Sequence, residues 1–164
     1  MEKLTQIISY LLDKYPYKRE LSNARVTKMI YLADWRNSII HKKQISNIDW
    51  YFDNYGPFVW DVYKNVTDND DIFDVINDTN MYGVGKRILF LNKKIDCNLL
   101  SEDDINVLDR IIESTKALNW NQFIRLVYST YPVISSERYK KLNLAEKAEE
   151  FINKKNEEAL KSAH

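Results

Sequence analysis

The segment from Val26 to about Ile40 constrains the fold more than any other part of the sequence. Its apolar residues recur at helical spacing, and together they cover more than half of the circumference of the helix that this spacing predicts. A helix that is apolar over so wide an arc packs against neighbours on both sides. The sequence therefore predicts a central helix, capped at its start by Ser22 or Asn23, that the rest of the chain surrounds.

The remaining periodic segments supply the surrounding helices. Residues 4–15 form one apolar stripe that ends at Pro16, and Ser101 with Asp104 resembles a capping box that opens a further helix. Residues 120–131 are apolar at helical spacing up to Pro132, and a Glu- and Lys-rich helix follows from Leu144, frayed beyond about Lys155. The chain has only 3 Gly and 3 Pro, which also favours helices over a turn-rich β architecture.

The sequence predicts a small β element beside these helices. In residues 50–63, WYFDNYGPFVWDVY, Trp50 and Phe52 alternate with polar neighbours, which indicates a short extended segment. Gly56 then permits a sharp turn, and Pro57 suits the first position of a helix. Residues 86–91, KRILFL, are the best strand candidate and are expected to pair near Trp50.

These elements predict a mainly α fold with a small β element (α+β). We expect a compact single-domain helical bundle with a short two- or three-stranded sheet. The acidic residues 67–80 are expected to form a loop with a weak helical turn near Ile72. We assign residues 1–143 to the domain and residues 144–164 to a charged C-terminal helix or tail.

Composition excludes several classes of protein. The 24 basic residues equal the 24 acidic ones, so no global positive field favours a nucleic-acid backbone, and nucleic acid is not an expected partner. The single cysteine, Cys97, cannot form an internal disulfide and fits a reducing compartment. No run reaches the roughly 20 apolar residues of a membrane span, and the N-terminus lacks the apolar stretch of a signal peptide. We therefore expect a cytoplasmic protein with no membrane partner.

The sequence offers little catalytic chemistry. His41 follows the apolar residues at the end of the central helix, and His164 is the final residue, so neither has a paired nucleophile or metal-ligand spacing. Cys97 has no CxxC partner. The aspartates of residues 68–74 lack the glycine and glutamate of a calcium loop, and GVGK at residues 83–86 lacks the spacing of a phosphate loop. We expect no catalytic residue, no metal, no cofactor and no enzymatic activity.

The large number of aromatic residues is not explained by any catalytic or metal-binding motif in the sequence. The chain has 11 Tyr and 4 Trp, and three tryptophans lie in or near the YGP turn in sequence. Most are expected in the core, and the remainder are of the types enriched in protein–protein hot spots. Asp34, inside the apolar helix, is expected to pair with a cation or to cap a neighbouring backbone; the alternative is an acidic contact for a basic partner.

Two motifs in this region resemble a known family. The helix VTKMIYLADW, with residues 28–34 matching the family's helix motif, and the segment DWYFDNYGPFVWDVY, with Tyr55, Gly56 and Pro57, are similar to the Panacea or SocA-like antitoxin domain. The segment LNWNQFIRLVYSTYP resembles the family's closing helix, although the histidine that often precedes its Trp-containing part is missing. The resemblance covers roughly residues 1–135.

The resemblance implies a function and partners. It implies a mostly helical antitoxin of a bacterial or prophage toxin–antitoxin system, of phage-associated type, that neutralises a cognate toxin protein by direct contact. Alternatives are an adaptor that delivers the toxin to a protease or unfoldase, a DNA-binding accessory protein or transcriptional regulator, and a homodimer. Added DNA-binding modules occur in the family, and none is visible in this sequence.

The aromatic excess then suggests a partner-binding surface near the YGP turn. Its predicted members are Asp34, Trp35, Arg36, Trp50, Tyr55, Gly56, Pro57, Phe58 and Trp60.

Overall fold

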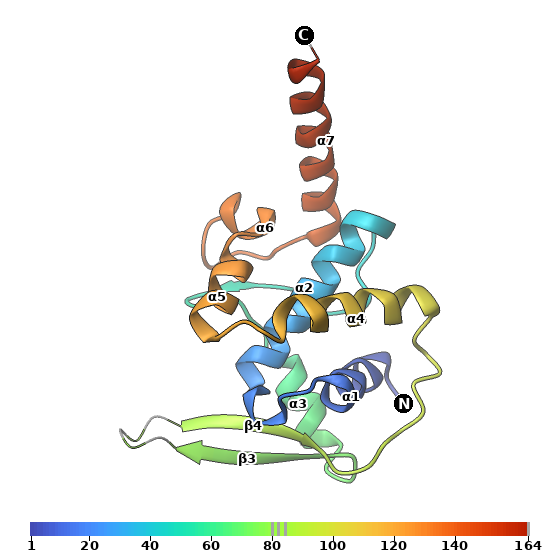
Figure 1. Ribbon diagram of the computed structural model, residues 1–164, viewed down its shortest axis with the longest axis vertical. Coiled ribbons are helices and arrows are strands. Elements are labelled where there is room, and N and C mark those ends of the chain that lie inside the picture. Colours follow the sequence, from blue (N-terminus) through green and yellow to red (C-terminus); the bar gives the residue numbers. More distant parts are fainter. Residues whose placement is uncertain (80, 82, 84, 164) are drawn as a thin grey trace.

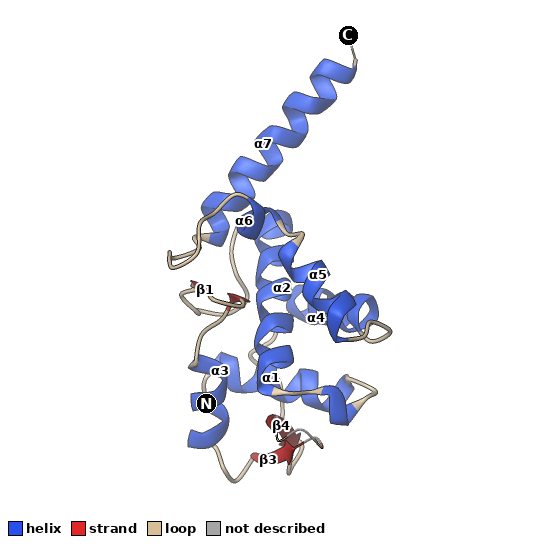
Figure 2. Ribbon diagram, turned by 90° about the vertical axis from the view of Figure 1, so that its left-hand side faces the viewer, coloured by secondary structure: helices blue, strands red, loops and turns tan. Residues whose placement is uncertain are grey.

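A computed structural model describes residues 1–79, 81, 83 and 85–163, and helix α2 (Asn23–His41) runs through its centre (Figures 1 and 2). Ser22 is the N-cap of α2, and its hydroxyl accepts a hydrogen bond from the backbone N–H of Arg25. Apolar side chains on every side of α2 are buried, from Val26 to Trp35. This confirms the prediction of a central helix.

The other helices surround α2 or extend from it. Ser101 forms the expected capping box with Asp104 at the start of α4. The described helices besides α2 are α1 (Lys3–Lys14), η1 (Lys18–Glu20), α3 (Asp61–Asp68), α4 (Glu102–Thr115), α5 (Trp120–Tyr128), α6 (Tyr131–Ile134) and α7 (Leu144–Ser162).

Two antiparallel pairs of strands make up the small β element. Strands β1 (Phe52–Asp53) and β2 (Gly56–Pro57) form a tight hairpin, and β3 (Phe73–Thr79) pairs with β4 (Gly85–Leu91) over their full lengths. The mainly α fold with a small β element is therefore confirmed in the described part of the chain.

The predicted pairing of residues 86–91 with the segment near Trp50 is wrong. Strand β4 pairs with β3, whereas the segment at Trp50 and Phe52 exchanges backbone hydrogen bonds with residues 139–142. Pro57 does not begin a helix either, because it lies in β2 opposite Phe52, and α3 begins at Asp61. Proline lacks an N–H, and the end of a two-residue strand tolerates that loss.

Three further local predictions are corrected. Residues 67–80 contain the end of α3 and the whole of β3 rather than a loop, because β4 pairs with β3 along its full length and Phe73 and Val75 pack on the core. Pro132 lies inside the first turn of α6, where a missing N–H costs nothing, and α5 ends earlier at Tyr128. Finally, α7 is helical to Ser162 rather than frayed beyond Lys155.

Helix α7 projects from the body of the molecule (Figure 1). Leu144 and Ala148 in its first turns are buried against the core, and the Phe151 ring lies 5.7 Å from that of Trp35. Residues 153–162 are exposed along their whole length. The helix therefore has a docked first half and a free second half.

Candidate protein-interaction site

An aromatic pocket of about 450 Å³ lies over the N-terminal half of α2. One wall comes from the β1–β2 hairpin and the link to α3, and the other comes from α5; Figure 2 shows these elements on either side of α2. Ala24 and Lys28 of α2 form its floor. The two walls consist of Asp53, Tyr55, Phe58 and Trp60 on the hairpin side and Trp120, Ile124 and Tyr128 on α5.

The hairpin wall depends on Gly56. Its φ of +95° is a conformation that residues with a side chain rarely adopt, so the turn selects glycine. A Cβ built at this position would lie 3.4 Å from the Tyr128 ring, which shows how closely the turn approaches α5. The two walls are therefore fixed relative to each other by direct contact.

Three aromatic side chains at the pocket rim are open to solvent. Tyr55 is 80% exposed, Trp60 58% and Trp120 43%. Phe58 packs edge-to-face on Trp60 with their ring centroids 5.1 Å apart, so Trp60 is held in place although it is exposed. Large, rigid and exposed aromatic side chains of this kind are enriched in protein–protein hot spots.

The pocket floor carries a buried cation. Lys28 is 2% exposed, its Nζ donates one long hydrogen bond of 3.4 Å to the carbonyl of Pro57, and it lies 5.3 Å from the centre of the Phe58 ring. Burial lowers the pKa of Lys28 to about 8, and the charge of Asp53 opposes part of that shift. Lys28 is therefore a costly charge in the free protein.

A wider groove of about 1010 Å³ continues from the pocket past Phe58, Trp60 and Trp120. Arg19, Lys86 and Arg87 line it, and the Arg87 guanidinium lies 5.8 Å from the centre of the Trp60 ring. Among the described residues that line it, the only acidic side chain is Glu20, which lies 4.0 Å from buried Arg25. The surroundings of the pocket are therefore positive although the whole chain is neutral.

Asp34 does not lie at the surface. Its buried carboxylate accepts hydrogen bonds from the backbone N–H groups of Ile45 and Ser46, both at 2.9 Å, and from the Trp50 indole at 2.8 Å. This confirms the expectation that Asp34 caps a neighbouring backbone. Burial raises the pKa of Asp34 to about 6, and the hydrogen bonds from Ser46, Trp50 and Ile45 oppose that shift.

Apart from Arg36, the other predicted contact residues divide into two groups. Trp35 and Trp50 are buried, at 7% and 1% exposure, and so are Gly56 and Pro57, so none of these four forms part of the exposed surface. Tyr55, Phe58 and Trp60 line the pocket. A binding role for any member of the predicted set remains a prediction.

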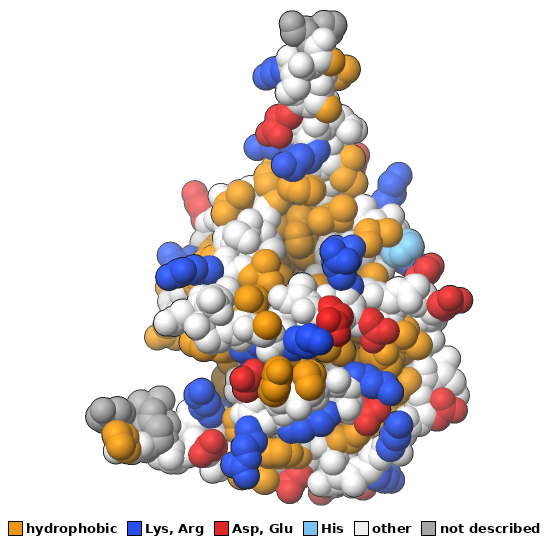
Figure 3. All heavy atoms as spheres, viewed as in Figure 1, with side chains coloured by type: hydrophobic (Ala, Val, Ile, Leu, Met, Phe, Trp, Pro, Cys, Tyr) orange, Lys and Arg blue, Asp and Glu red, His pale blue; other side chains and the backbone are white. Residues whose placement is uncertain are grey.

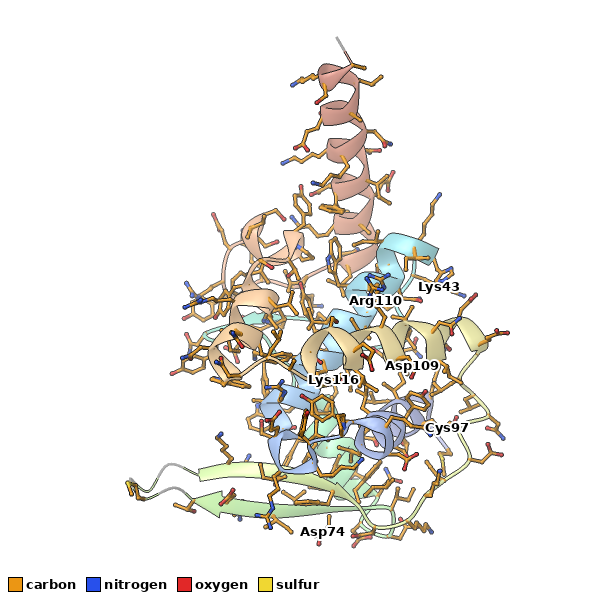
Figure 4. All side chains as sticks on the ribbon, in the orientation of Figure 1. Lys43, Asp74, Cys97, Asp109, Arg110 and Lys116 are labelled. Atoms are coloured by element: carbon orange, nitrogen blue, oxygen red, sulfur yellow. The ribbon has the colours of Figure 1, made fainter. Side chains whose placement is uncertain are left out.

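Arg36 is half-buried and lies elsewhere, in a second groove with Trp35 at the base of α7. Figure 3 shows apolar side chains gathered in this region, and Figure 4 places Arg110 of α4 beside it. Arg125 of α5 lines the same groove. The structure therefore does not bring Arg36 together with the YGP turn.

Six residues that line the pocket are absent from the predicted contact set, namely Ala24, Lys28, Asp53, Trp120, Ile124 and Tyr128, and two of them matter most for the site. Trp120 lies at the start of the apolar face of α5, where its spacing assigns it to the core. Lys28 was noted only as part of the family motif. The position of Lys28 could have indicated its role, because a lysine within the wide apolar face of a central helix has to bury its charge.

The remaining chemical candidates lie away from the pocket. His41 is the exposed last residue of α2, and Cys97 is a half-buried free thiol between β4 and α4, visible in Figure 4. Burial and the charges of Asp96 and Asp13 raise the pKa of Cys97, which disfavours a reactive thiolate. The turn at residues 83–86 lies partly outside the described residues.

Within the described ranges, no three His, Cys, Asp or Glu side chains are grouped so that they could hold a metal ion. In the same ranges, no helix combines the length and the apolar character needed to span a bilayer.

A family model described as "Antitoxin SocA-like, Panacea domain" matches residues 26–132. The match covers well over half of the chain and includes both pocket walls and Lys28. Comparisons with curated proteins and with solved structures give no match.

Proposed function

Because the chain belongs to the SocA-like antitoxin family of Panacea domains, we propose that it neutralises a toxin protein by binding it directly. The protein acts in the cytoplasm by occupying a surface that the toxin needs, and it performs no reaction of its own. Residues 1–143 form the toxin-binding domain, and residues 144–164 are a charged extension.

The exposed aromatic rim of the pocket is the observation that carries this proposal. Trp60 and Trp120 face each other across one pocket, and both expose large apolar rings next to positive side chains. Both indoles pack against neighbouring rings, but their exposed faces contribute little to the fold, whereas an interface gains most of its energy from a few such residues. The toxin therefore docks over Tyr55, Trp60 and Trp120.

Co-expression with the protein encoded by the adjacent gene tests this proposal. We expect the wild-type chain to restore growth and to bind that protein in calorimetry. The Trp60→Ala variant should bind with a free energy weaker by about 2 kcal/mol, because a centrally placed aromatic anchor is lost.

Tyr17→Ala is the matched control, because Tyr17 is 53% exposed but does not line the pocket or the adjoining groove. Circular dichroism establishes that both variants fold. If folded Trp60→Ala binds and rescues as well as Tyr17→Ala, the toxin does not use this surface.

The free half of α7 supports a second candidate function, that of a protease adaptor. Residues 153–162 are exposed and project from the body, as an unfoldase-docking segment would. Such an adaptor would still bind the toxin at the pocket, and the second half of α7 would contact the protease. A DNA-binding accessory role and a homodimer remain weaker proposals, which a shift assay and light scattering address.

A further inference from the structure

Lys28 is buried in a way that a structural cation is not. Arg25, one turn earlier on α2 and 3% exposed, donates from Nη2 to the Tyr15 hydroxyl at 2.9 Å and to the carbonyls of Thr115 and Leu118 at 2.9 and 3.0 Å. It thereby ties α2 to the end of α4. Buried charges that serve stability are usually satisfied in this manner.

Lys28 has no comparable set of partners. An ammonium group has three N–H donors, and the structure gives Lys28 a single long bond, to the Pro57 carbonyl at 3.4 Å. Asp53 lines the same pocket, but no ion pair within 4.0 Å joins it to Lys28, and the structure describes both residues. The ammonium is thus buried at the floor of an aromatic pocket with donors to spare.

We propose that this pocket receives an aspartate or glutamate side chain of the toxin, whose carboxylate binds the ammonium group of Lys28. The proposal rests on the proposed function and specifies the chemistry of the partner. An apolar stem of one or two methylene groups would pass between Trp60 and Trp120, and the carboxylate would reach the floor. A charge-assisted hydrogen bond in such a dry site is stronger than one at the surface.

The surrounding charges fit a carboxylate better than other ligands. Arg19, Lys86 and Arg87 in the adjoining groove make its mouth positive, which favours an acidic segment. Asp53 in the pocket wall opposes a dianion such as phosphate more strongly than a monoanion. A neutral amide would leave the charge of Lys28 unpaired.

A double-mutant cycle between the two proteins tests the proposal. We replace Lys28 by Met, which keeps most of the length of the side chain and removes the charge, and we replace each Asp and Glu of the adjacent-gene protein by Asn or Gln. Calorimetry then measures Kd for each pair.

We expect Lys28→Met to raise Kd by about 10- to 100-fold. One carboxylate of the toxin should show a similar loss when neutralised, and its combination with Lys28→Met should cost little more. Lys43→Met is the control, because Lys43 lies exposed after the far end of α2 (Figure 4). Lys28→Gln provides a second neutral variant if Lys28→Met does not fold.

The pH dependence supplies an independent readout. The free Lys28 loses its proton near pH 8, so Kd of the wild type should rise by about tenfold per pH unit above that value. Kd of Lys28→Met should stay flat there. The other titratable groups that face Lys28 are Asp53 on β1, Tyr55 in the turn and Tyr128 on α5.

The outcomes separate the two proposals. If Lys28→Met binds as tightly as the wild type while Trp60→Ala does not, the aromatic surface stands and the carboxylate site is wrong. If no toxin carboxylate couples to Lys28, the site is equally wrong. If neither variant changes Kd, the toxin binds another surface and both the pocket and the carboxylate site are wrong. If the wild-type chain does not bind the adjacent-gene protein, the proposed function itself fails.

Discussion

At the scale of single residues, helix α2 contains three buried charges that are satisfied to different degrees. Nη2 of Arg25 and the carboxylate of Asp34 each have several hydrogen-bonding partners, although Nε of Arg25 has none among the described residues. Lys28, between these two residues, has a single long hydrogen bond in the described part of the chain. A residue that is expensive to bury and poorly paired lowers the stability of the free protein, which is typical of functional sites.

We therefore expect Lys28→Met to raise the free energy of unfolding at pH 7, by about 2 kcal/mol, because the folded state no longer has to hold a desolvated charge. The sign follows from the lowered pKa of about 8: above that pH the folded state has released the proton that the unfolded chain still binds. The free energy of unfolding of the wild type should therefore rise relative to that of the variant as the pH increases from about 8 to 10.

Urea unfolding of both proteins at pH 7 and pH 10 measures this effect. A Lys28→Met chain that is less stable than the wild type at pH 7 would show that the ammonium contributes to the fold, contrary to this argument. Lys43→Met should leave the unfolding free energy nearly unchanged, because Lys43 is exposed.

At the scale of elements, the β1–β2 hairpin depends on the backbone conformation of Gly56. Gly56→Ala should lower the free energy of unfolding by about 1–2 kcal/mol, because a side chain disfavours positive φ and the new Cβ presses on Tyr128. Gly83→Ala is the matched control: its φ is +76°, but, its two chain neighbours aside, no heavy atom of the described residues lies within 4 Å of its Cβ position. Chemical denaturation should show a larger loss of unfolding free energy for Gly56→Ala than for Gly83→Ala. Equal losses would show that the contact with Tyr128 does not contribute.

Helices were predictable from the sequence because their signals are local. The cap at Ser22, the capping box at Ser101 and the wide apolar arc of α2 each lie within a few residues of the structure that they specify. The partners of strands are not local. Strand β3 buries only its first residue fully and carries Asp74 and Asp78, so its sequence resembles a solvated loop until β4 is in place.

The candidate site was predictable in part, for the same reason. Phe58 and Trp60 adjoin the YGP turn in sequence, and the structure places them in the pocket. Trp120 comes from a helix about sixty residues away, so no local pattern joins it to them. Trp35 and Trp50 lie near the turn in sequence, but their size and the hydrogen bond from Trp50 to Asp34 assign them to the core.

At the scale of the whole molecule, α7 separates into parts with different roles. A chain ending at Lys155 should unfold within about 0.5 kcal/mol of the wild type, because the described residues that it loses, 156–163, are exposed. A chain ending at Asn143 should lose about 3 kcal/mol or more, because Leu144, Ala148 and Phe151 leave the core uncovered.

The shorter deletion also separates the two candidate functions. An antitoxin that acts by occlusion keeps growth rescue without residues 156–164, whereas an adaptor that uses the second half of α7 loses it. Toxin levels measured by immunoblot during rescue distinguish the cases, since only the adaptor depletes the toxin.

The backbone bonds between residues 50–52 and 139–142 have a consequence for synthesis in the cell. The amide of Leu142 donates to the carbonyl of Trp50, and that of Phe52 donates to the carbonyl of Lys140. Residues 139–142, which are synthesised late, therefore hold the base of the hairpin. When the ribosome has translated the hairpin wall of the pocket, it has not yet translated residues 139–142, whose backbone hydrogen bonds hold that hairpin. Chains that are released early, or cut between these segments, would contain the pocket side chains without the backbone bonds that position them. Binding of the toxin would therefore require an intact polypeptide.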